Sequence, residues 1–257
     1  MTVLLVDVGN TRIKWARLEG ARLGRGRAAA HSGWRPRDYL RHLFATPRAL
    51  ARVVVASVAG AAVDEALAAA ARRARVPARF IRVARRAGGV TVGYPEPWRL
   101  GVDRFAAMVG AHELLAAVPV CVVGVGTAMT IDLVDAHGRH RGGVIVPAPH
   151  LMVGTLLTRT HGIRRRARGG AGGGAGLFGR STREGVERGA RYAAAALIDR
   201  AVEEASALLG REPLVALTGG QAAAVAPLLR SRSLGVPDLV LRGLAVLSRD
   251  APRARRR

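Results

Sequence analysis

The sequence predicts an α/β protein made of two related halves. Short apolar runs typical of buried strands alternate with longer alanine-rich segments typical of helices. Two segments share one layout of strand, glycine turn, strand and second turn: LLVDVGNTRIKWARLEG from Leu4 and CVVGVGTAMTIDLVDAH from Cys121. The second copy begins 117 residues after the first, and because the two share this layout we interpret them as a duplicated unit.

The first half is predicted to open on a β-hairpin. Residues 3–6 form an apolar strand, Gly9-Asn10 marks a turn, and residues 11–18 form the returning strand. A further strand is expected at residues 53–58, and helices are expected at 61–75 and 103–115. We place the first domain at residues 1–118.

The second half, residues 119–257, is predicted to repeat the hairpin. Its strands are expected at 120–123, 129–134, 142–146 and 214–217, and its long helix at 183–209. The glycine- and arginine-rich stretch 164–176 is predicted to be a mobile loop, and the arginine-rich end is predicted to be a disordered tail.

Composition narrows the class of protein. The sequence contains no run of about 18 or more uncharged apolar residues, the length needed to span a membrane. Its amino terminus lacks the basic head and long apolar stretch of a signal peptide. The single cysteine, Cys121, excludes an intramolecular disulfide and a cysteine-rich metal site, and its apolar surroundings predict a buried structural thiol. We therefore expect a cytoplasmic protein with no membrane partner.

The formal net charge of +23 raises the question of nucleic-acid binding. Apart from clusters at 164–168 and 253–257, however, the arginines are spread along the chain. Aromatic residues make up only 4%, too few to suggest a platform on which bases could stack. We therefore expect only non-specific, salt-sensitive binding to nucleic acid.

The first candidate site is the turn DVGNT, which begins at Asp7. Glycine lets backbone N–H groups approach an anion closely, and Asn10 and Thr11 add donors. Lys14 on the returning strand is the only lysine among 41 lysine and arginine residues, and its compact ammonium differs most from a guanidinium at a phosphate. Asp7 could orient Mg²⁺, directly or through water. The alternative interpretation is an ordinary hairpin with a solvated aspartate.

The matching turn of the second copy is GTAMTID, from Gly126 to Asp132. Two such turns in a duplicated unit would face each other across a cleft and hold a polyphosphate between them. The chain contains no Walker-type P-loop, in which spaced glycines precede Gly-Lys-Ser or Gly-Lys-Thr.

The third candidate site is LGVDR, which begins at Leu100. Asp103 opens a helical pattern, and the helix amino terminus would lower the pKa of its carboxyl and keep it ionised. Such a carboxylate can accept the proton of an attacking hydroxyl during phosphoryl transfer, while Arg104 could hold an anion. The alternative interpretation is a simple N-cap aspartate.

Taken in order along the chain, these motifs resemble those of the type III pantothenate kinase family, within the superfamily that unites acetate and sugar kinases with Hsp70 and actin. The resemblance extends from Thr2 to about Gly243 and is carried by DVGNTRIK from Asp7, Tyr94, GVDR from Gly101, GTAMTID, GGVIVP from Gly142, and Ser181-Thr182.

The resemblance implies two ribonuclease-H-like domains with a nucleotide cleft between them, the actin-like ATPase fold. It also implies ATP-dependent phosphorylation of pantothenate to 4'-phosphopantothenate, the first step of coenzyme A biosynthesis, and a homodimer. Asp103 would be the catalytic proton acceptor. ATP and Mg²⁺ would be bound by Asp7, Val8, Gly9, Asn10, Thr11, Arg12, Ile13, Lys14 and Thr127. Pantothenate would be bound by Tyr94, Gly101, Val102, Asp103, Arg104 and Thr182.

One position departs from the family pattern. Where the family has an aspartate that binds a monovalent cation, K⁺ or NH₄⁺, this chain has Gly124, which offers no side-chain oxygen. The cation requirement is therefore left open by the sequence. Two other functions also stay open: a regulatory or nucleic-acid-binding protein on a kinase-like scaffold, and a kinase for another small alcohol.

Overall fold

The structure is a computed structural model that describes residues 1–45, 49–168 and 176–249. These residues divide into two compact units. The first unit draws on residues 1–117, 137–140 and 238–249, and the second on 118–136 and 141–237. The chain therefore crosses between the units at residues 117–118, and again at 136–137, 140–141 and 237–238.

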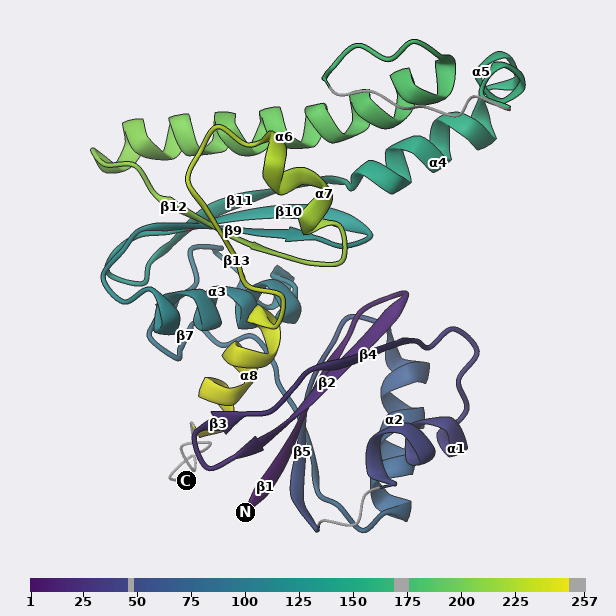
Figure 1. The fold of residues 1–257 in the computed structure, drawn as a ribbon. Coiled ribbons are helices and arrows are strands. Elements are labelled where there is room, and N and C mark those ends of the chain that lie inside the picture. The colour runs from purple at the N-terminus through teal and green to yellow at the C-terminus, as the bar shows by residue number, and fades with distance from the viewer. Residues whose placement is uncertain (46–48, 169–175, 250–257) are drawn as a thin grey trace. The chain divides into compact units, whose positions relative to one another are not determined.

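The first unit is built on a mixed sheet with the strand order β3-β2-β1-β5-β6, and β4 also pairs with β2 (Figure 1). Strand β1 lies antiparallel to β2 and parallel to β5, so it is the centre of the sheet. The strands are β1 (Thr2–Val8), β2 (Arg12–Glu19), β3 (Arg22–Leu23), β4 (Arg27–Ala30), β5 (Leu50–Ser57) and β6 (Ala78–Phe80). A small hairpin of β7 (Arg86–Ala87) and β8 (Val90–Thr91) and the single turn η2 (Pro97–Arg99) follow.

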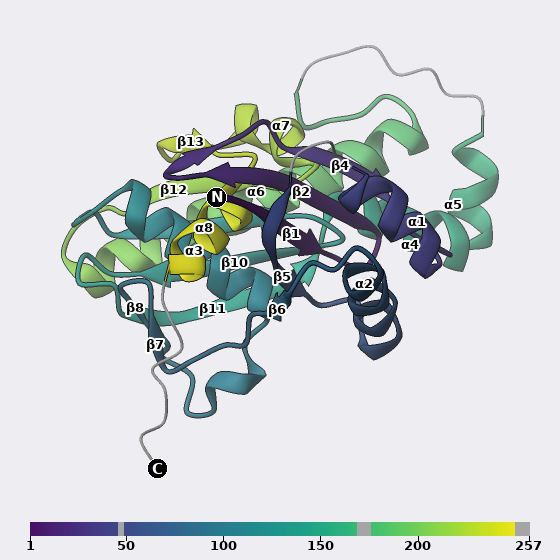
Figure 2. The same cartoon turned by 90° about the horizontal axis from the view of Figure 1, so that it is seen from below.

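Alternation along β1 and β2 separates the two faces of this sheet. On one face, Leu4 and Val6 join a core with α1 (Pro36–Tyr39), the π-helical turn η1 (Leu40–Phe44) and α2 (Ala61–Arg73). Helices α3 (Val102–Leu114) and α8 (Leu239–Arg249) also pack on this sheet and on each other (Figure 2).

Helices α3 and α8 approach so closely that two glycines are required at their contact. A Cβ atom on Gly110 would lie 2.8 Å from the backbone nitrogen of Gly243, and one on Gly243 would overlap the carbonyl of Ala106. The sequence predicted α3 but not α8, and it assigned residues 238–249 to the second half. In the structure these residues belong to the first unit.

The second unit repeats the arrangement with the strand order β11-β10-β9-β12-β13. Strand β9 lies antiparallel to β10 and parallel to β12, as β1 does to β2 and β5. The strands are β9 (Val120–Val125), β10 (Ala128–Val134), β11 (His140–Pro147), β12 (Leu214–Thr218) and β13 (Ser233–Gly235). The equivalent order of strands confirms the duplicated α/β fold that the sequence predicted.

The long helix α6 (Thr182–Leu209) covers one face of the second sheet, with α4 (Pro149–Arg159) beside it (Figure 1). The unit is completed by α5 (His161–Arg166), α7 (Ala222–Val225) and the single turn η3 (Ala226–Leu228). The core between sheet and helix contains Cys121, only 1% exposed. This position confirms that the thiol is buried, as the sequence predicted. Burial raises the pKa of the thiol to about 12.

Part of the predicted loop 164–176 is wrong, because residues 164–166 form the last turn of α5. The remainder of that loop falls largely at residues 169–175, and the predicted tail at 250–257; both lie outside the described residues. Within the part of the chain that the structure describes, no helix is long and apolar enough to cross a membrane.

Candidate functional site

The turn between β1 and β2 is tight and open to solvent at its tip. The Gly9 N–H donates to the Arg12 carbonyl at 3.0 Å, and a Cβ atom on Gly9 would lie 3.2 Å from that same oxygen. A side chain at position 9 would therefore be tight against this carbonyl. Asn10 and Thr11 are exposed at the tip, as a phosphate-binding turn requires.

Asp7 and Lys14 are directly opposite each other in the register of β1 and β2, so their side chains share one face of the sheet. Val8 and Ile13, the next pair, are buried in the core on the other face. Asp7 is partly accessible at its surface, yet burial of the carboxyl raises its pKa to about 7, against the opposing effect of Lys14. Nearby Asp103 raises this pKa further.

Asp103 occupies the second position of α3, and Gly101 is the N-cap. The alternative interpretation of Asp103 as the N-cap is therefore wrong. Its Oδ1 accepts a hydrogen bond from the Arg104 N–H at 2.8 Å, within the first turn of the helix. A Cβ atom on Gly101 would lie 2.6 Å from that Oδ1, so glycine leaves room for the carboxylate.

Tyr94 and Arg104 lie against each other. The largely buried Arg104 guanidinium donates to the Tyr94 hydroxyl at 3.3 Å, and its central carbon lies 5.8 Å from the centre of the Tyr94 ring. His140 packs on the same ring with centroids 5.4 Å apart. Arg85 donates to the carbonyls of Val92 at 3.1 Å and Tyr94 at 2.6 Å, and so holds the segment that carries Tyr94.

The second unit carries the matching turn. The Gly126 N–H donates to the Ala128 carbonyl at 3.0 Å, and Thr127 is exposed at the tip. Gly124 lies opposite Thr130 of β10 and Thr218 of β12, and a Cβ atom on Gly124 would lie 3.1 Å from the Thr130 hydroxyl.

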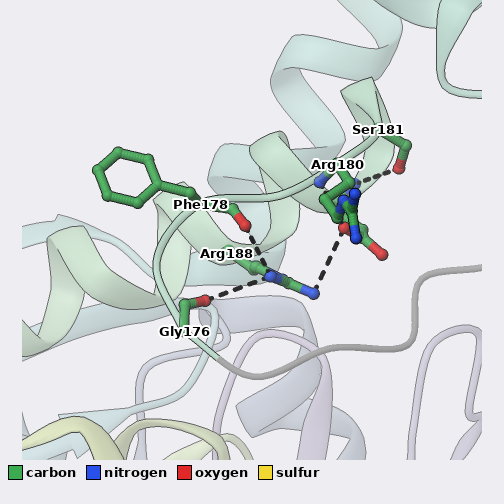
Figure 3. A network of polar contacts seen from close by, with 6 residues as sticks. Gly176, Phe178, Arg180, Ser181 and Arg188 are labelled. Atoms are coloured by element: carbon green, nitrogen blue, oxygen red, sulfur yellow. Dashed lines mark hydrogen bonds and ion pairs between the residues drawn. The ribbon is translucent and has the colours of Figure 1, made fainter.

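Thr182 is the first residue of α6, and a polar network holds the chain in front of it (Figure 3). Ser181 caps the helix by accepting from the Glu184 N–H at 3.2 Å. The buried Arg188 guanidinium donates to the Phe178 carbonyl at 2.9 Å and pairs with Glu184 at 3.3 Å. This network holds the start of α6, and with it the position of Thr182.

The structure thus groups the predicted residues by unit. Asp7, Lys14, Asp103, Tyr94 and Arg104 belong to the first unit, and Gly124, Thr127 and Thr182 to the second. Among the described residues no group of three or more His, Cys, Asp or Glu side chains could hold a metal ion alone. A single carboxylate such as Asp7 fits Mg²⁺, which is usually held by one or two carboxylates together with phosphates and water.

A cavity of about 390 Å³ lies elsewhere in the first unit and is not part of this site. It is lined by Leu4 and Trp15, which face the core with α1 and α2, and by side chains of β2 to β4. Asp7 is on the opposite face of β1 because successive side chains alternate along a strand.

Sequence reasoning missed three side chains that support the site: His31, Arg85 and His140. His31 is 4% exposed, and its Nε2 lies 2.7 Å from the Gly9 carbonyl oxygen. None of the three stands in a motif. Strands β2 to β4 separate His31 from Gly9 in the sequence, and α3, β9 and β10 separate His140 from Tyr94.

Comparison with known proteins identifies the family. A model of the family described as type III pantothenate kinase matches residues 3–204. The type III pantothenate kinase of Azoarcus sp. strain BH72 is 38% identical over 255 residues, covering 96% of this chain and 90% of the relative. The protein of the same description from Stenotrophomonas maltophilia strain R551-3 is also 38% identical, covering 95% of this chain and 96% of the relative.

Solved structures share the fold at low sequence identity. A Campylobacter jejuni protein described as a Baf family transcriptional activator has a TM-score of 0.59 at 18% identity, covering 94% of each chain. A glucokinase of the ROK family from Streptomyces griseus, in complex with glucose and AMPPNP, has a TM-score of 0.54 at 12% identity, covering 96% of this chain and 99% of the other. At these identities the likeness concerns the fold alone, and the regulatory alternative is not favoured. With the family model and the relatives in agreement over nearly the full length, the chain belongs to the type III pantothenate kinase family.

Proposed function

We propose that this protein transfers the γ-phosphoryl group of ATP to pantothenate and so forms 4'-phosphopantothenate at the start of coenzyme A biosynthesis. One observation carries the proposal. In a chain of this family, Asp7 is paired with Lys14 across β1 and β2, beside the solvent-exposed tip of the Gly9 turn. Asp103 is close enough for its charge to affect the pKa of the Asp7 carboxyl.

The roles follow from the chemistry of the side chains. The backbone N–H groups of the Gly9 turn and the Lys14 ammonium would bind the phosphates and neutralise the charge that develops on them. Asp7 would hold Mg²⁺ through water. Mg²⁺, when bound, supplies further charge neutralisation between the phosphates. Thr127 of the second unit would add a second contact to ATP.

Asp103 would accept the proton of the pantothenate hydroxyl as that oxygen attacks the γ-phosphorus and the bond to ADP breaks. Tyr94 and Arg104 would bind pantothenate, and a guanidinium held against a tyrosine ring suits its carboxylate. Thr182 would add a hydroxyl contact from the start of α6.

The deciding experiment measures release of ADP with pantothenate as the acceptor, and then with each of a panel of other small alcohols in its place. Turnover with pantothenate alone supports the proposal. Turnover only with another alcohol would retain the kinase and reject the substrate.

The monovalent cation requires its own test, because Gly124 lacks the side-chain oxygen that the family uses. We expect activity in Na⁺ to equal activity in K⁺ or NH₄⁺, and Gly124→Asp to introduce dependence on K⁺. Strong K⁺ activation of the unchanged protein would mean that other oxygens hold the cation; Thr130, opposite Gly124, offers one.

We further propose that the protein acts in the cytoplasm as a homodimer. Light scattering across a range of protein concentrations tests the assembly, and a constant monomer mass would contradict it.

A further inference from the structure

A buried histidine lies directly beneath the candidate phosphate turn. His31 follows β4, and the pairing of Ala30 with Arg12 brings it beside the start of β2. Its ring is 4% exposed, with Nε2 at 2.7 Å from the Gly9 carbonyl oxygen and Nδ1 at 3.2 Å from the Tyr39 hydroxyl.

The chemistry of these partners fixes which ring nitrogen carries the proton. A carbonyl oxygen only accepts hydrogen bonds, so Nε2 must be protonated and donate to Gly9. In the neutral ring Nδ1 then accepts from the Tyr39 hydroxyl, which can donate. The ring is held further by Trp34, which packs edge-on against His31 at 6.3 Å and against Tyr39 at 5.2 Å between centroids.

The direction of the Gly9 carbonyl determines the direction of the next N–H group. A trans peptide unit is planar, so its C=O and N–H bonds point in opposite directions. With the Gly9 carbonyl drawn toward His31, the Asn10 N–H points away from the ring, at the exposed tip of the turn. The N–H of Gly9 itself is already used by the Arg12 carbonyl at 3.0 Å.

We propose that His31 is a positioning residue for the phosphates of ATP. By holding the Gly9 carbonyl inward, it presents the Asn10 N–H to the phosphate and keeps a carbonyl oxygen from facing it. If this peptide unit rotated by half a turn, an acceptor would replace the donor and repel the anion. The inference rests on the proposed function only in that the Gly9 turn binds the phosphates of a nucleotide.

The test compares His31→Gln with His31→Leu. The glutamine amide can still donate toward Gly9, whereas leucine fills a similar volume without a donor. We expect His31→Leu to raise both the KM for ATP and the Kd for ATP by about tenfold, as the loss of one charge-assisted hydrogen bond would, while the KM for pantothenate stays unchanged. His31→Gln should stay within about threefold of the unchanged protein.

His42→Leu is the matched control. His42 is an exposed histidine that stacks on the same Trp34 at 4.5 Å between centroids, and its Nε2 lies 3.5 Å from the Arg41 guanidinium. We expect its KM for ATP to be unchanged. A general loss of stability would move the Tm of a variant but would not raise the KM for ATP selectively.

If His31→Leu does not fold, the ¹⁵N–¹H spectrum of the unchanged protein keeps the inference testable. Saturating ATP should shift the Asn10 amide resonance strongly, and an unmoved resonance would overturn the inference. Equal KM values for ATP in His31→Leu and the unchanged protein would also overturn it, while leaving pantothenate turnover intact. Conversely, His31-dependent binding of ATP without turnover of pantothenate would reject the proposed function and retain the inference.

Discussion

Asp103 and Asp7 are neighbouring carboxyl groups for which we propose different roles. Asp103 stands at the start of α3 with its Oδ1 bonded to the Arg104 N–H, oriented by the helix that carries it. We expect Asp103→Asn to lower kcat by about 10²–10⁴-fold, the usual contribution of a general base, with little change in the KM for ATP. Steady-state ADP release checks this. Equal kcat values in a variant of unchanged Tm would remove Asp103 from the role.

Asp7 should make stability depend on pH. Its pKa rises from 3.8 to about 7 in the folded protein, so between these values the folded state binds more protons than the unfolded state. Stability therefore falls as pH rises through this window, and the loss is complete above pH 7. Asp7→Asn should flatten the decline, which urea unfolding at pH 5 and pH 8 would reveal. An equally steep decline in the variant would contradict the assignment.

The sequence revealed those site residues that lie close together along the chain. Asp7, Gly9 and Lys14 lie within one hairpin, so their spacing alone brings them together. His31 reaches Gly9 across 22 positions of sequence, and no period or motif encodes such a contact. The pKa of Asp7 likewise depends on burial and on Asp103, neither of which is visible in the turn itself.

At the scale of elements, the contact between α3 and α8 depends on glycine. We expect Gly110→Ala to lower the free energy of unfolding by about 1–3 kcal/mol, because the added methyl meets backbone atoms that cannot move aside. Gly189→Ala on α6 is the matched control. Its Cβ would meet nothing within 4 Å, so it should be neutral or stabilising by up to about 1 kcal/mol. Urea unfolding of both variants checks the difference, and equal values would contradict the packing argument.

Most of the long elements were predictable from the sequence, and the shortest ones were not. The strands and helices over 3–6, 11–18, 61–75, 103–115 and 183–209 have a clear apolar period, and the structure confirms each within a few residues. Elements of two to four residues, such as β3 and α7, are too short to show any period. Helices α4 and α8, of eleven residues each, were missed. The apolar period of α8 was present in the sequence, but its packing against α3, more than 100 residues earlier, could not be read from that period.

At the scale of the whole molecule, the charge of +23 predicts binding to polyanions without selectivity. We expect retention on duplex DNA to fall by a factor of about 10³ or more between 50 and 200 mM salt. Two DNA duplexes of unrelated sequence should behave alike in this measurement. Retention of one sequence at the higher salt would contradict the prediction.

The duplication was the most reliable guide to the whole fold. Once LLVDVGNTRIKW and CVVGVGTAMTID were aligned, each copy predicted a hairpin, and the structure has both: β1 pairs antiparallel with β2, and β9 with β10. The parallel pairing of β1 with β5, and of β9 with β12, was not predicted. The membership of the units was harder to predict, because duplication does not reveal that residues 238–249 return to the first unit.

That return sets an order of assembly on the ribosome. Residues 118–237 leave the exit tunnel before 238–249, so the second unit has its complete sequence while α3 still lacks the helix that covers it. The half that is translated first must therefore mature last. Until then, the nascent chain exposes the apolar side of α3, and apolar surface exposed during folding makes a chain prone to aggregation.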